Sequence, residues 1–181
     1  MTTDDELRRM TIGEPRRHDA PIALVEYDPA WPLLYAREAD RIRAALGDRV
    51  VLLEHTGSTS VPGLAAKPII DMTLAVADTT AEGDYVPPLE AAGYVLRIRE
   101  PDWYEHRMLR GTDPEVNLHV FSTGCEEIGR MLRFRDRLRF SPEDRALYLA
   151  RKRELATRTW RYTQNYADAK SAVVAEILAR G

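Results

Sequence analysis

Residues 55–74 read HTGSTSVPGLAAKPIIDMTL, and the architecture of the chain can be inferred from this stretch. It begins where an apolar run ends, and Gly57 opens a loop rich in glycine and proline, which interrupt regular structure. The chain then returns as the apolar run Ile69–Val76, which contains one acid, Asp71. A near-continuous apolar run is typical of a central strand that is covered on both faces. The stretch therefore predicts strand, loop and strand, with an acid inside a sheet.

The loop of this stretch has the composition of a phosphate-binding loop. Gly57 lets backbone N–H groups approach a ligand without a side chain in the way. Ser58, Thr59 and Ser60 add hydroxyl donors, and Lys67 adds a positive charge. A short helix that starts here would point its N-terminus at an anion. The alternative for Ser58 is an ordinary helix cap.

Asp71 is the candidate catalytic acid and metal ligand. A lone carboxylate in a buried strand is costly unless it is paired or bound to a cation. Magnesium prefers carboxylate oxygens together with phosphates. The alternative is that Asp71 caps a turn or pairs with an arginine. We expect a divalent metal at this position, with Mg²⁺ or Mn²⁺ favoured and Zn²⁺ as a further option.

Working outward from this stretch, hydrophobic periodicity and turn residues predict an α+β fold. The expected fold is a mixed β-sheet of about four strands packed with helices, followed by a helical C-terminal third. Residues 1–21 are expected to be a flexible tail or a strap, and residues 22–181 a single domain. The predicted helices are Trp31–Leu46, Thr80–Ala92, Glu126–Phe140, 143–159 and 163–179, and the predicted strands are 49–55, 69–76, 94–99, 105–110 and 115–121.

The composition excludes several classes of protein. A length of 181 residues is enough for one domain with a core of its own. The net charge of −3 argues against broad binding to nucleic acid. No apolar run approaches the roughly 20 residues that a membrane span requires. The single cysteine, Cys125, fits a reducing compartment, so we expect a cytoplasmic protein without a membrane partner.

The histidines offer a second set of candidate ligands. Alternation along the strand EVNLHVF places Asn117 and His119 on one face, where they could bind one metal ion together with Asp71. His119 is also a candidate catalytic acid or base, and His55 ends the strand that precedes the loop. If the strands are neighbours, His55, His106 and His119 converge on Asp71. An imidazole ligand suits zinc, manganese or iron better than magnesium. The alternative is that each histidine hydrogen-bonds a loop carbonyl.

The C-terminal helices supply further basic and aromatic side chains. Arg135 and Arg139 are four residues apart, so they share a helix face and could clamp phosphates. Lys170 is a third basic candidate there. The alternative is that the arginines lie on a solvated helix face and that the tyrosines of these helices pack in the core. The other polar residues noted on these helices are Tyr148, Lys152 and Tyr166.

Most of the chain, from about Ile22 to Ala179, resembles the GrpB family. The matching stretches are YDPAW, EHTGSTSVPGLAAKPIIDMTLAV, LEAAGYVLR, EHRMLRG, VNLHVF and LRFRDRLR, with a closing Y-x-x-x-K pattern at Tyr166 and Lys170. The resemblance implies the nucleotidyltransferase fold of the polymerase-beta superfamily, in which a Gly-Ser pair and a strand-borne acid correspond to Gly57, Ser58 and Asp71. Related domains are fused to some dephospho-CoA kinases.

The chain departs from that superfamily at its acids. Thr73 stands where a second carboxylate is usual, and the later strand has no aspartate. Three acids that hold two metal ions can therefore not be assembled. The main hypothesis is a metal-dependent transfer of a nucleotidyl group from a nucleoside triphosphate to a small molecule or protein. The alternatives are a non-catalytic module that binds a nucleotide or a coenzyme A-like molecule or assists a protein partner, and a metal-dependent hydrolase.

Overall fold

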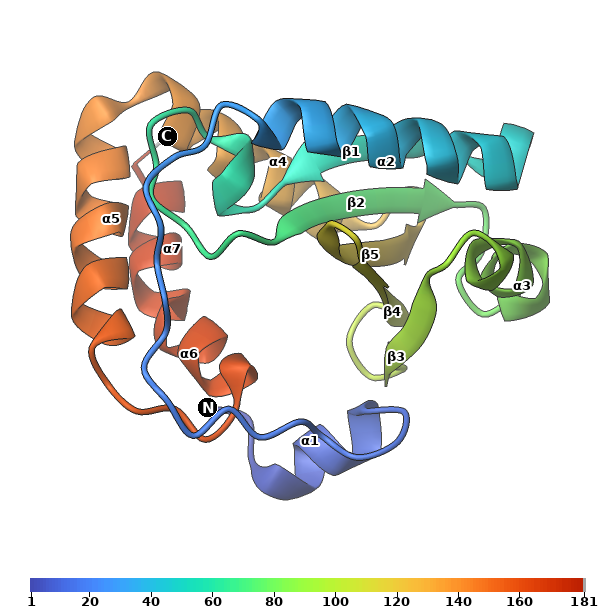
Figure 1. The fold of residues 1–181 in the computed structure, drawn as a ribbon, viewed down its shortest axis with the longest axis horizontal. Coiled ribbons are helices and arrows are strands. Elements are labelled where there is room, and N and C mark those ends of the chain that lie inside the picture. Colours follow the sequence, from blue (N-terminus) through green and yellow to red (C-terminus); the bar gives the residue numbers. More distant parts are fainter. Residues whose placement is uncertain (181) are drawn as a thin grey trace.

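A single mixed sheet forms the centre of the computed structural model, which describes residues 1–180 (Figure 1). The strands are β1 (Leu52–Thr56), β2 (Ile70–Val76), β3 (Val95–Glu100), β4 (His106–Thr112) and β5 (Glu115–Ser122). Their order across the sheet is β1-β2-β5-β4-β3, in which β2 and β5 are parallel and the other neighbours are antiparallel. The α+β prediction is confirmed, with five strands in place of about four.

Seven α-helices surround the sheet in the described part of the chain. They are α1 (Asp4–Met10), α2 (Trp31–Leu46), α3 (Glu82–Ala91), α4 (Glu126–Phe140), α5 (Pro142–Ala156), α6 (Thr163–Ala169) and α7 (Ser171–Leu178). The bounds of α2 agree with the prediction, because Gly47, with φ 56°, ends it. The single helix predicted over residues 163–179 is instead two helices, α6 and α7, separated by Lys170.

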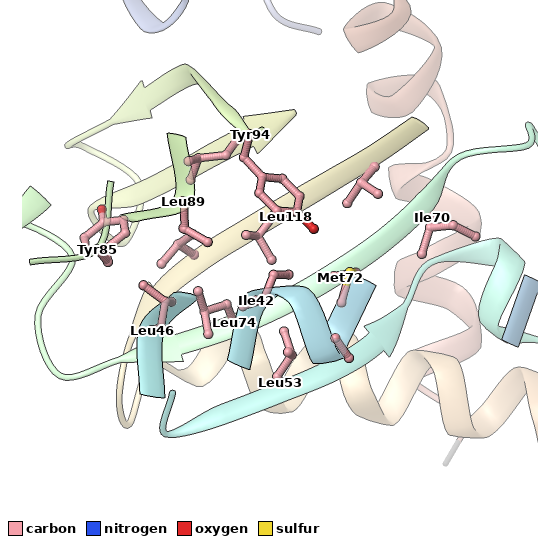
Figure 2. Packing of buried hydrophobic residues seen from close by; sticks show 14 of the residues in the cluster. Ile42, Leu46, Leu53, Ile70, Met72, Leu74, Tyr85, Leu89, Tyr94 and Leu118 are labelled. Carbon is pink, nitrogen blue, oxygen red and sulfur yellow. The ribbon is translucent and has the colours of Figure 1, made fainter. Parts of the chain in front are cut away.

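One face of the sheet is the main hydrophobic core. Along β2, Met72 and Leu74 point to this face, where they pack with Ile42 and Leu46 of α2 and with Leu118 of β5 (Figure 2). All five side chains are at most 1% exposed. Because side chains alternate along a strand, the residues between them, such as Asp71 and Thr73, must face the other side of the sheet.

Helix α4 covers part of this second face. Ala75 and Phe121 pack there with Ile128 of α4. Helices α5 and α7 lie beyond the end of the sheet, where Tyr148 and Ile177 belong to a separate cluster with the loop that follows β1 (Figure 1). The start of β2, where Asp71 lies, is thus next to the C-terminal helices and not under the centre of α4.

The N-terminal segment joins two distant parts of the molecule. Thr11 forms an antiparallel bridge with Ile98 of β3, and Ala20 forms one with Trp160 in the α5–α6 connection. The segment also contains a helix that was not predicted from the sequence, α1, which Thr3 caps through a capping box and which buries Leu7. The contacts at both ends correspond to the strap that the sequence offered as an alternative to a flexible tail. Further along the chain, Val25 forms a single antiparallel bridge with Ala66.

Candidate functional site

The loop after β1 brings the backbone against Asp71. Gly57 has φ 66°, and a Cβ built on it would lie 2.3 Å from Oδ2 of Asp71. Only glycine therefore fits this position, since it needs both a left-handed backbone and the space of a missing side chain. Residues 58–60 then form a short 3₁₀ turn.

The hydroxyl groups of this turn are used within the loop. Thr59 donates to the carbonyl oxygen of Ile69 at 3.1 Å, and Ser60 donates to that of Gly57 at 2.6 Å. Both side chains are buried. The hydroxyl protons of Thr59 and Ser60 are thus used within the loop, whereas Ser58 is half-buried beside Gly57.

Asp71 is held by its neighbour in the sheet. The parallel pairing of β2 with β5 sets Asn117 directly beside Asp71. The side-chain amide nitrogen of Asn117 donates to Oδ1 of Asp71 at 2.9 Å. Asn117 therefore orients the acid and uses its amide on it. Burial raises the pKa of Asp71, and the Asn117 hydrogen bond and the charges of three lysines oppose that rise.

His119 lies one pleat further along β5, on the same face. Its Nε2 atom is 4.0 Å from Oδ1 of Asp71, and its Nδ1 atom is 3.0 Å from Nε2 of His106. Burial, with a contribution from His106, lowers the pKa of His119 to about 3. His119 is therefore neutral at physiological pH and has a nitrogen lone pair available.

Three lysines lie close enough to Asp71 for their charges to lower its pKa. Lys67 comes from the loop, Lys152 from α5 and Lys170 from the break between α6 and α7, and the charge of each acts on the pKa of Asp71. They are the only lysines of the chain, whose other 23 basic residues are arginines. We call Asp71, Lys67, Lys152 and Lys170 the lysine site. When all three lysines are protonated, they carry more positive charge than this one carboxylate can neutralise.

The surroundings of the lysines show how this charge is held. Lys152 is 2% exposed, and its Nζ atom donates to the carbonyl oxygen of Ala65 at 2.6 Å. Burial lowers the pKa of Lys152 to about 7 and that of Lys67 to about 8, and it also lowers the pKa of Lys170. Lys170 lies over the ring of Tyr166 at 4.7 Å from its centroid. A polyanion that paired with the lysines would relieve their mutual repulsion.

Sequence reasoning gave no role to Lys152 or Tyr148, although both belong to the site. They lie one helical turn apart on α5, with Nζ of Lys152 5.3 Å from the ring centroid of Tyr148. Burial raises the pKa of Tyr148 to about 12, and the Ser58 side chain opposes the rise. Helical spacing in the sequence shows only that the two share a face. The fold alone shows that this face meets Asp71.

The structure does not bring His55 to Asp71. His55 pairs with Met72 across the β1–β2 ladder, so its side chain lies on the α2 face of the sheet. It stacks on Tyr35 with ring centroids 4.7 Å apart, and Nε2 is 3.1 Å from the Thr59 hydroxyl. A metal site built on His55, His106, His119 and Asp71, as the hydrolase hypothesis requires, is therefore not formed.

Arg135 and Arg139 are also directed elsewhere. Arg135 pairs with Glu54 and Asp136, and Arg139 donates to the carbonyl oxygen of Ser60. Both arginines line a separate pocket of about 440 Å³. That pocket is lined by Tyr27, Pro32, Tyr35, Glu54, His55, Ser60, Pro62, Arg135, Arg139, Phe140 and Arg145. The predicted arginine clamp is thus at a different place from the lysine site.

The residues around Asp71 fit a divalent ion that arrives with a ligand. Among the described residues, no group of three or more His, Cys, Asp or Glu side chains could hold a metal. Nε2 of His119 and Oδ1 of Asp71 are 4.0 Å apart, so metal bonds of about 2.0–2.2 Å from both atoms would reach only an ion that lies nearly on the line between them. The remaining positions on such an ion would be filled by phosphate oxygens and water.

Among the described residues, no helix is both long and apolar enough to cross a membrane.

Comparison with solved structures supports the assignment of the fold. The crystal structure of the conserved protein GrpB from Enterococcus faecalis matches with a TM-score of 0.74 and 31% identity, over 87% of this chain and 98% of that one. The Cid1 poly(U) polymerase matches with a TM-score of 0.50 and 13% identity, over 72% of this chain and 43% of that one. At this identity, the second match shows the fold alone, which is nucleotidyltransferase-like.

Comparison with curated proteins gives the family. A UPF0157 protein of Halalkalibacterium halodurans is 58% identical over 178 residues, which are 98% of this chain and 91% of that protein. A dephospho-CoA kinase of Mycolicibacterium paratuberculosis is 34% identical over 77% of this chain and 40% of its own length. The family described as GrpB protein matches residues 21–180. The chain therefore belongs to the GrpB family.

Proposed function

We propose that this protein transfers a nucleotidyl group from a nucleoside triphosphate to a small molecule or a protein. The observation that carries the proposal is the lysine site, in which the charges of all three lysines of the chain act on one carboxylate. Three ammonium groups next to the Gly57 backbone suit a triphosphate, which carries several negative charges on a short chain of atoms. The nucleotidyltransferase-like fold of this chain is consistent with this chemistry.

In the proposed reaction, Lys67, Lys152 and Lys170 hold the phosphates, and the Gly57 amide and the Ser58 hydroxyl approach them from the loop. A hydroxyl oxygen of the acceptor attacks the α-phosphorus and its proton is released to water. The bond from that phosphorus to the bridging oxygen breaks, and pyrophosphate leaves. Asp71 and His119 would hold a divalent cation, Mn²⁺ or Mg²⁺, which neutralises phosphate charge. Catalysis then consists mainly of positioning and charge neutralisation. The single cysteine fits a cytoplasmic place of action.

A second function is favoured by the missing carboxylate. The Thr73 hydroxyl, where a second acid would be expected, pairs with Thr56 at 2.9 Å and contacts the sulfur of Met131. With one acid, the site would bind a nucleotide or a coenzyme A-like molecule without turnover, or support a protein partner. Similarity to part of a dephospho-CoA kinase is consistent with such a role.

A thermal-shift panel tests the proposal. Each ribonucleoside triphosphate and coenzyme A is added with and without Mn²⁺. A ligand at 100 times its Kd stabilises the protein by about 2.7 kcal/mol, which moves Tm by several degrees. We expect a shift with one triphosphate that requires metal and is lost in Lys152→Gln. The matched control is Arg151→Gln, the exposed neighbour on α5, which should respond like the wild type.

The variant Asp71→Asn separates the two functions. A transferase loses metal-dependent pyrophosphate release in this variant while the fold remains intact. A binding module keeps its ligand, since the lysines are unchanged. A folded wild-type protein that responds to none of the triphosphates would contradict the transferase, and a response to coenzyme A alone would support the binding module.

A further inference from the structure

Behind His119, a chain of polar side chains runs away from the lysine site. Nδ1 of His119 is 3.0 Å from Nε2 of His106, and Nδ1 of His106 is 2.7 Å from Oε2 of Glu100. The three residues come from the adjacent strands β5, β4 and β3. Neither Glu100 nor His106 contacts Asp71 directly, so any influence on the site must pass through His119.

The position of His106 in this chain is fixed by aromatic packing. Its side chain is 3% exposed. The ring of Trp103 meets it edge-on with centroids 5.1 Å apart, and the ring of Phe121 stacks on it at 4.8 Å. A ring enclosed in this way can neither turn freely nor exchange its partners for water. Its two hydrogen bonds therefore persist as a unit.

The order of donors and acceptors along this series of hydrogen bonds follows from Glu100, the residue at its end. A carboxylate can only accept a hydrogen bond, so Nδ1 of His106 carries a proton that it donates to Glu100. Nε2 of a neutral His106 is then an acceptor, and Nδ1 of His119 must be the donor to it. This leaves Nε2 of His119 without a proton and with its lone pair on the side of Asp71.

We propose that the Glu100–His106 pair locks His119 in the tautomer with the proton on Nδ1, so that Nε2 is kept as a ligand atom for a divalent cation that has affinity for imidazole. Glu100 and His106 are thus positioning residues. The distance between Nε2 of His119 and Oδ1 of Asp71 agrees with this assignment. It is 4.0 Å, too long for a hydrogen bond.

The other tautomer would change the site. With its proton on Nε2, His119 could donate to Asp71 and close the space between them, so the pair would satisfy itself without a cation. Carboxylate–histidine pairs that orient a ligand histidine occur widely in metal proteins, and removing one typically weakens metal affinity by about 10- to 100-fold. The value of this lock to catalysis rests on the proposed function, whereas the tautomer itself does not.

The tautomer can be measured directly in the metal-free protein. Long-range ¹H–¹⁵N correlation spectra distinguish a protonated from an unprotonated ring nitrogen. We expect the wild type to show His119 protonated at Nδ1 only. In His106→Phe, which preserves the aromatic packing but has no acceptor, we expect a mixture of tautomers. His106→Gln retains one donor and one acceptor and should restore the single tautomer.

Titration with Zn²⁺, a diamagnetic probe, provides the second readout. We expect Nε2 of His119 to respond in the wild type, an affinity about 10- to 100-fold weaker in His106→Phe and recovery in His106→Gln. Trp103→Phe is the matched control, because Trp103 contacts the His106 ring but makes none of the hydrogen bonds of this chain. Its Zn²⁺ affinity should stay within about twofold of the wild type.

Two results would overturn the inference. One is a wild-type His119 that is protonated at Nε2, and the other is a tautomer or Zn²⁺ affinity that does not change in His106→Phe. The wild-type spectrum decides the first even if a variant fails to fold. A wild-type protein that does not respond to any triphosphate but shows His119 protonated at Nδ1 only would refute the proposed function and leave the tautomer lock in place. The two failures can therefore be told apart.

Discussion

At the scale of the residue, Gly57 shows how closely the loop and the acid are fitted together. Gly57→Ala would place a methyl group 2.3 Å from Oδ2 of Asp71, in addition to the strain of a positive φ. We expect a loss of about 1–3 kcal/mol in the free energy of unfolding and loss of the triphosphate response. Urea unfolding measures the first, and the thermal-shift panel the second.

The matched control for this prediction is Gly63→Ala in the same loop. Gly63 has φ 76°, but a Cβ built there meets no atom within 4 Å. It therefore carries the backbone strain without the collision with Asp71. Gly63→Ala should keep its ligand response. Equal effects of the two variants would show that strain alone, and not the approach to Asp71, explains the need for glycine.

Lys152 should make stability depend on pH. Its pKa is lowered from 10.5 to about 7 by burial. Between these values the unfolded chain binds a proton that the folded protein does not, so the free energy of unfolding rises with pH, by at most about 1.4 kcal/mol per pH unit for one proton. Below about pH 7 both states are protonated and the dependence ends.

Lys152→Met removes this proton. We expect its unfolding free energy to rise less steeply than that of the wild type between about pH 7 and 10, as measured by urea unfolding at several pH values. Arg151→Gln, on the exposed side of α5, should retain the wild-type slope. Parallel slopes for wild type and Lys152→Met would mean that Lys152 is charged in the folded protein.

At the level of a single helix, α2 carries a buried and an exposed leucine, so the effect of burial can be compared for the same residue type. Leu46 and Leu33 lie on the same helix, but they are 1% and 73% exposed. Leu46→Ala should lower the unfolding free energy by about 2–5 kcal/mol because it leaves a cavity over β2. Leu33→Ala should change it by less than about 0.5 kcal/mol. Chemical denaturation of the two variants checks the pair, and similar losses would contradict the packing shown in Figure 2.

Elements with a strong periodic pattern were predictable, and those whose ends depend on distant contacts were not. The apolar spacing and Gly47 gave both ends of α2. The break at Lys170 has no glycine or proline to mark it. Helix α1 was missed because its only buried apolar residue is Leu7. A single buried apolar residue cannot show the spacing by which a helix is recognised in a sequence.

At the scale of the whole molecule, the site is assembled from segments whose distances no sequence pattern records. Strand alternation placed Asn117 and His119 correctly on one face. His55 lies on the opposite face, which α2 covers, because it pairs with Met72 across the β1–β2 ladder. The sequence does not give this register, so the face of His55 could not be predicted. Lys152 faces Asp71 only because α5 packs at the end of the sheet. Local chemistry was therefore predictable, and convergence was not.

The N-terminal segment offers a test of how the whole chain is held. Leu7 is 5% exposed in α1, although a flexible tail was one expectation for residues 1–21. If the segment packs in solution, Leu7→Ala should lower the unfolding free energy by about 2 kcal/mol. Arg8→Ala, on the exposed side of α1, is the control. No difference between them in urea unfolding would support the flexible tail.

The distribution of basic residues has a consequence for chemistry performed on the protein. Arginine carries the positive charge of the outer surface, and the chain has no lysine outside the lysine site. Apart from the N-terminal amine, every primary amine is thus in one place. Reductive methylation with ¹³C-formaldehyde would then install probes only at the N-terminus and at the proposed ligand-binding position. An amine-reactive ester of the kind used for immobilisation would modify that proposed position instead of the outer surface.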